Sequence, residues 1–130
     1  MKNIEIDFYS EFEGEDEIVF FIKTDEYTKE LRMWHWYLDM ILMRIEVAEH
    51  EEWTSLAYYY HLILGWEVEK NWQIPNLEEA LSQLQSITIE VDDTNNQIYN
   101  NAEYRILSEM ISIISEAINR KLPVYINKVD

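Results

Sequence analysis

The feature that most constrains this chain is a stretch of eighteen residues, Leu31 to Ala48, that contains neither glycine nor proline. Apolar residues recur in it at steps of three and four, the spacing of one face of a helix. One such series is Leu31, Trp34, Leu38, Ile41, Ile45 and Ala48, and a second beside it is Met33, Trp36, Tyr37, Met40, Met43 and Val47. A helix that is apolar over most of its circumference must be covered on several sides. Because Thr24 or Asp25 can cap it, we expect a central helix over residues 27–48.

The N-terminal residues predict two strands and an acidic turn. Ile4, Ile6 and Phe8 alternate with polar residues, a pattern typical of a half-buried strand. Residues 18–23 are apolar on both faces and predict a more central strand. Residues 11–17, between them, hold five acids and a glycine. We therefore expect an acidic turn that joins the two strands in an antiparallel hairpin.

Helices and strands are also predicted along the rest of the chain. Helical spacing predicts helices over 53–64, 77–84 and 98–120, and alternation predicts strands over 86–92 and 124–129. A chain of 130 residues has room for one domain, residues 1–130. The expected fold class is α+β: a small, mainly antiparallel sheet, made of the N-terminal hairpin plus two later strands. We expect it to be packed with about four helices, with the 27–48 helix central.

The charge of the chain is strongly and unevenly negative. Asp and Glu number 26 against 10 Lys and Arg, for a net charge of −16. Residues 1–30 carry a net charge of −7 and residues 67–96 carry −6, whereas residues 97–130 are neutral. Such a field repels nucleic acid and anionic membranes and attracts cationic surfaces. We expect a basic protein partner, and binding to neither nucleic acid nor membrane.

The composition also bears on the compartment. The chain has no cysteine, which excludes disulfides and thiolate metal sites and fits a reducing environment. Its first residues place acids between apolar side chains, unlike a signal peptide. No apolar run approaches the roughly 20 residues that cross a bilayer. We expect a soluble cytoplasmic protein.

Catalytic and metal-binding signatures are missing from the sequence. With only two glycines, Gly14 and Gly65, the chain cannot contain GxSxG, GxGxxG or a P-loop. His50 begins a near match to the zinc-protease pattern HExxH, but Thr54 stands where the second histidine is needed. We therefore expect no enzyme, no metal and no cofactor.

His35 and Asp39 lie one helical turn apart and are a conceivable proton-transfer pair. The alternative is that His35 and Asp39 form a purely structural hydrogen bond, flanked by the tryptophans on either side of His35. We favour the structural interpretation, because a lone histidine without further partners is more often structural than catalytic.

Some aromatic residues fall outside the buried faces of the predicted helices. Tyr58 and Tyr59 lie off the apolar face of the 53–64 helix, and Trp66 and Trp72 lie in or beside an acidic loop. Such rings either cover the core or anchor a partner whose basic groups the carboxylates attract. On the second interpretation, two groups of residues are candidates for binding a partner. They are Glu11, Glu13, Glu15, Asp16 and Glu17 in the first turn, and Tyr58, Tyr59, Trp66, Glu67, Glu69 and Trp72.

One segment resembles a known group of proteins. It combines Trp53, a tyrosine-rich helix, Gly65-Trp66, Trp72, Ile74-Pro75-Asn76-Leu77 and a short leucine-rich helix. This pattern, over about a quarter of the chain, resembles small acidic bacterial immunity proteins of polymorphic toxin and contact-dependent growth inhibition systems. The resemblance implies a non-enzymatic inhibitor that binds one cognate toxin domain, often a nuclease. It carries over no binding residues, because immunity proteins bind through non-equivalent surfaces.

Three hypotheses follow. The first is an immunity protein that neutralises a basic toxin domain. We expect this domain to be a nuclease, because the site where a nuclease holds phosphate is basic. The second is an acidic nucleic-acid mimic that inhibits a defence nuclease or a DNA-binding protein. The third is an enzyme that uses His35 and Asp39. The localised acids and the missing catalytic motifs favour the first.

Overall fold

A computed structural model describes residues 2–45, 72–87, 89 and 98–129. The described residues form five strands and three helices. In chain order they are β1 (Lys2–Phe8), β2 (Glu17–Lys23), β3 (Tyr27–Trp34), α1 (His35–Leu42), β4 (Trp72–Gln73), α3 (Leu77–Gln85), α4 (Ile98–Arg120) and β5 (Tyr125–Val129). The fold is α+β, as the sequence predicts.

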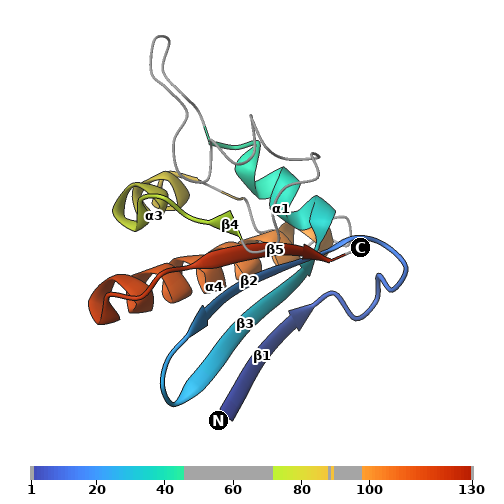
Figure 1. The fold of residues 1–130 in the computed structure, drawn as a ribbon. Helices are drawn as coiled ribbons and strands as arrows, with labels where there is room; N and C mark the ends of the chain where they lie inside the picture. Colours follow the sequence, from blue (N-terminus) through green and yellow to red (C-terminus); the bar gives the residue numbers. More distant parts are fainter. Residues whose placement is uncertain (1, 46–71, 88, 90–97, 130) are drawn as a thin grey trace.

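The strands form one mixed sheet in the order β1-β3-β2-β5-β4 (Figure 1). β1 runs parallel to β3, and the other three pairs of neighbours are antiparallel. α1 and α4 pack against β2 and β3, and α3 packs against α4. The core lies between these helices and the sheet.

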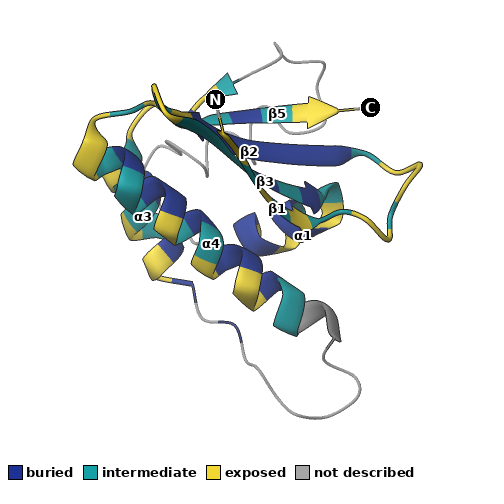
Figure 2. Ribbon diagram, turned by 90° about the horizontal axis from the view of Figure 1, so that it is seen from below, coloured by how far each residue is buried: buried dark blue, intermediate teal, exposed yellow. Residues whose placement is uncertain are grey.

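β2 is the buried centre of the sheet, and this part of the prediction is confirmed. Residues 17–22 are all buried, and only Lys23 at the end of the strand is exposed. Figure 2 shows β2 in the colour of buried residues along most of its length. Ile18, Phe20 and Ile22 belong to the core that the helices cover, whereas Val19 and Phe21 alternate onto the other face. A strand that is apolar on both faces needs a hydrogen-bonded neighbour at each edge, and β3 and β5 provide them.

The prediction of a helix over 27–48 is wrong for its first eight residues, which form β3, and for residues 43–45, which follow the end of α1. Leu31 and Met33 alternate inward and pair with Phe20 and Ile18 of β2. A nearly continuous apolar run satisfies a period of two and a period of 3.6 at once. The need of β2 for a partner decides in favour of the strand. The helix begins only at His35, and residues 46–48 lie outside the described part of the chain.

The predicted N-terminal hairpin is also wrong, because β3 lies between β1 and β2. The tight turn joins β2 to β3 instead. There the Thr24 hydroxyl accepts hydrogen bonds from the backbone N–H groups of Glu26 and Tyr27, at 3.1 and 2.9 Å. Thr24 therefore stabilises a turn between strands and does not cap a helix. The sheet is mixed rather than only antiparallel.

The C-terminal half follows the sequence more closely. α3 begins as predicted, since the Asn76 side chain accepts a hydrogen bond from the Glu79 N–H at 3.0 Å. α4 ends near Lys121, which has a φ of 57°, and β5 follows as predicted. Of the predicted 86–92 strand, the described residues 86, 87 and 89 are not in a strand, and the others lie outside the description. The predicted 53–64 helix also lies outside it.

Candidate protein-binding surface

The acidic segment between β1 and β2 occupies a position that the topology dictates. Because β1 and β3 are parallel, Phe8 and Met33 lie side by side at the same edge of the sheet. Glu17, the first residue of β2, pairs with Trp34 at that edge. Residues 9–16, here called the acidic connection, must therefore pass the end of β3, where α1 begins (Figure 1).

Hydrogen bonds give the acidic connection a defined shape. At its start, Asp7 Oδ1 accepts from the N–H groups of Tyr9 and Ser10, at 2.7 and 3.1 Å. The Tyr9 hydroxyl donates to the carbonyl of Glu15 across the loop. Gly14 has a φ of 99°, which side chains other than glycine rarely adopt. At its end, the carbonyl of Asp16 accepts from the His35 N–H of α1 at 3.1 Å.

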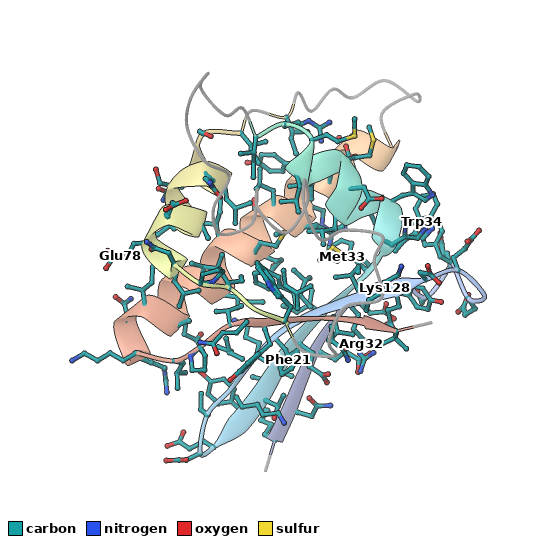
Figure 3. All side chains as sticks on the ribbon, turned by 45° about the horizontal axis from the view of Figure 1, so that its top comes forward. Phe21, Arg32, Met33, Trp34, Glu78 and Lys128 are labelled. Carbon is teal, nitrogen blue, oxygen red and sulfur yellow. The ribbon has the colours of Figure 1, made fainter. Side chains whose placement is uncertain are left out.

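Aromatic packing fixes the connection to the start of α1. The rings of Phe12 and Trp34 stack with centroids 4.3 Å apart and planes 7° apart. Tyr37 meets both rings edge-on at 5.6 Å. Figure 3 shows Trp34 beside the connection, at the end of β3. Pairs of this kind contribute about 0.5–1.5 kcal/mol each beyond the area they bury.

The five predicted acids of this region divide into two groups. Glu11, Glu13 and Glu15 are exposed, and within the described residues none of them forms an ion pair. Asp16 pairs with Lys128 at 3.5 Å. Glu17 is buried in β2 and engaged by Arg32. Of these five carboxylates, the first three are thus exposed and have no ion-pair partner among the described residues.

Arg32 lies among three carboxylates on the face of the sheet away from the helices. Its guanidinium lies 3.1 Å from Glu17, 3.2 Å from Glu30 and 3.7 Å from Glu5. Burial alone would lower the pKa of Arg32, but the hydrogen bond and charge of Glu17, followed by the charges of Glu30 and Glu5, raise it. These three carboxylates pair with an arginine of the same sheet, so we assign them a structural role.

His35 and Asp39 lie together at the start of α1. His35 Nδ1 is 3.7 Å from Asp39 Oδ2, and the Trp34 and Trp36 rings lie 6.1 and 5.4 Å from the imidazole. Both side chains are only partly exposed. His35 thus lies beside two tryptophan rings, and its distance from Asp39 is longer than that of a hydrogen bond. Two shallow cavities of about 550 and 560 Å³ that described residues line lie elsewhere, beside the C-terminal end of α4.

Asp39 makes stability depend on pH. Burial raises its pKa above the ordinary 3.8, and the nearby His35 and the charge of Lys128 lower it only in part. The folded chain therefore holds this proton more tightly than the unfolded chain. Stability from this group is fully present below pH 3.8 and is lost as the pH rises through the raised pKa.

Replacing Asp39 by Asn removes this titration. We expect D39N to gain stability relative to the wild type as the pH rises from about 3.5 to about 7, measured by urea unfolding at several pH values. If instead the wild type became more stable relative to D39N over that range, the His35 and Lys128 charges would affect the pKa of Asp39 more than burial does.

The second predicted group is mostly untested by the geometry. Tyr58, Tyr59, Trp66, Glu67 and Glu69 lie outside the described residues. Trp72 lies in β4, where it is half-buried and packs against the core. That position agrees with the alternative that this ring helps to cover the core.

The structure also reveals exposed residues that the sequence reasoning assigned to the core. Trp36, Met40 and Met43 are 48%, 41% and 58% exposed, and we call them the α1 stripe. The opposite side of α1 buries Tyr37, Leu38, Ile41 and Leu42. Their spacing alone predicts that the three residues share one side of a helix. It does not predict that this side is exposed, because that depends on α1 having only one buried face.

Other kinds of site find no support in the described part of the chain. There, no group of three His, Asp or Glu side chains is arranged to hold a metal ion. None of the described helices has the length and apolarity to cross a bilayer. In comparisons with known proteins, the chain matches no family model, no curated protein and no solved structure.

Proposed function

We propose that this chain is a non-enzymatic immunity protein that binds and neutralises a basic toxin domain of the nuclease class. One observation carries the proposal: the acidic connection presents Glu11, Glu13 and Glu15 as exposed carboxylates without ion-pair partners in the described structure. They project from a loop that hydrogen bonds and a ring stack hold in place.

The physical argument is one of electrostatic complementarity. A loop that is already ordered loses little backbone conformational entropy when a partner binds. The field of its carboxylates, reinforced by a net charge of −16, accelerates encounter with a cationic surface. A nuclease must bind phosphates, so its active-site cleft is such a surface. Occupying that cleft would exclude the substrate without any bond-making by the inhibitor.

The nucleic-acid mimic is less well supported by the geometry. A mimic needs carboxylates spaced like phosphates along an extended face. Here Glu5, Glu17 and Glu30 surround Arg32. Asp25 and Glu26 lie at the other end of β2 and β3, in the turn between these strands. Glu11, Glu13 and Glu15, by contrast, are exposed within the single eight-residue loop of the acidic connection.

Co-expression tests the proposed function. The C-terminal domain of the protein encoded immediately upstream is produced in a sensitive bacterium, with and without this chain. We expect the domain alone to stop growth, the wild-type chain to restore it, and the two purified proteins to form a complex. A nontoxic upstream product, or a toxic one that this chain neither binds nor neutralises, would contradict the proposal.

A further inference from the structure

We propose that the α1 stripe is the apolar centre of the partner-binding surface, and that the acidic connection forms its charged edge. This inference rests on the proposed function and specifies the chemistry of the partner. It predicts a basic protein domain with an apolar pocket bordered by Lys or Arg. Trp36, Met40 and Met43 would enter that pocket.

The first argument is the geometry of the stripe. Trp36 and Met40 lie on one side of α1, and Met43, which caps the C-terminal end of α1 in a right-handed helical conformation, continues the same line. Seven residues of helix correspond to about 10 Å along the axis. All three side chains are more than 40% exposed, although they are large and apolar. Tyr37, Leu38, Ile41 and Leu42 already supply the buried face. The stripe is therefore not needed to attach α1 to the core.

The second argument is continuity with the free carboxylates. A series of ring contacts runs from the acidic connection to the stripe. Phe12 stacks on Trp34 at 4.3 Å, Trp34 meets His35 at 6.1 Å, and His35 meets Trp36 at 5.4 Å. The Asp16 carbonyl also accepts the first N–H of α1. The apolar and acidic parts are thus adjacent and held in a fixed relation.

The third argument identifies the occupant. Protein interfaces place Trp and Met at a desolvated centre and charged groups at the rim. A rim with three unpaired carboxylates selects a partner with a cationic rim and disfavours an acidic one. A second copy of this chain would bring the same three carboxylates and another net charge of −16 to the contact. Charge complementarity therefore favours a basic protein over self-association.

Binding kinetics test the inference on the full-length chain, with the toxin domain encoded upstream as the immobilised probe. One variant is W36S, and a second is M40S/M43S, which leaves the ring series intact. We expect each to raise the dissociation rate constant about 10–100-fold, because anchor residues act mainly on dissociation. The matched control is Y104S on α4, since Tyr104 is 49% exposed. It should leave the rate constant unchanged.

The outcomes separate the inference from the proposed function. Thermal unfolding of each variant first establishes that it is folded like the wild type. If the wild type binds the toxin domain and both stripe variants dissociate at the rate of Y104S, the inference is wrong and the proposed function stands. If the wild-type chain does not bind the toxin domain, the proposed function fails and the inference falls with it.

Discussion

Replacing Arg44 by methionine should lower the free energy of unfolding by about 3–4 kcal/mol. Arg44 Nη2 lies 3.2 Å from Glu103 Oε2, and Glu103 of α4 is only 2% exposed. Without the guanidinium, a buried carboxylate would lose this partner, and its desolvation would no longer be offset. Arg44 also donates to the carbonyl of Met40 at 2.9 Å, so the pair links the end of α1 to α4.

Urea unfolding of three variants isolates this effect. R44M/E103Q should be more stable than R44M, because it removes the unpaired charge along with its partner. R105M, which changes an exposed arginine on the same helix α4, should cost less than about 1 kcal/mol, since Arg105 contributes a contact with the Phe8 ring at 5.2 Å. An R44M protein as stable as R105M would show that Glu103 does not depend on this ion pair.

The sequence predicted the elements whose signals are local. The Asn76 cap of α3, the long apolar face of α4, and the doubly apolar β2 are each specified by neighbouring residues. The identity of β3 depended on a contact distant in sequence. Leu31 and Met33 fit both the period of a strand and the period of a helix, and only the pairing with β2 decides between the two structures. The parallel pairing of β1 with β3 is likewise a tertiary choice that no local pattern records.

The candidate surface shows the same division. An acidic turn over residues 11–17 followed from composition, and the structure places all of these residues except Glu17 in the acidic connection, with Glu11, Glu13 and Glu15 exposed. Their position beside α1 could not be predicted from composition, because it depends on β3 lying between β1 and β2, so that the connection passes the end of β3. The exposure of Trp36 was missed for a related reason. A helix predicted to be central has no open side, whereas α1 covers one edge of the core.

Reversing two charges of the acidic connection should slow association with the toxin domain about 10–100-fold at low salt. The variant is E11K/E13K, and neither side chain forms an ion pair in the described structure. Its matched control is D25K/E26K, which changes the net charge equally. Asp25 and Glu26 are exposed in the turn at the opposite end of β2, about 20 Å away by strand length. At about 0.1 M salt the control should slow association far less, because the Debye length is then about 10 Å and the control lies about twice as far away.

The most direct test of the account is the association rate constant of these three proteins as a function of ionic strength. We predict a steep decrease with salt for the wild type, a similar decrease for D25K/E26K, and a slow, nearly salt-independent rate for E11K/E13K. An E11K/E13K protein that associates as fast as the wild type, with the same dependence on salt, would contradict the claim that the acidic connection meets a basic partner.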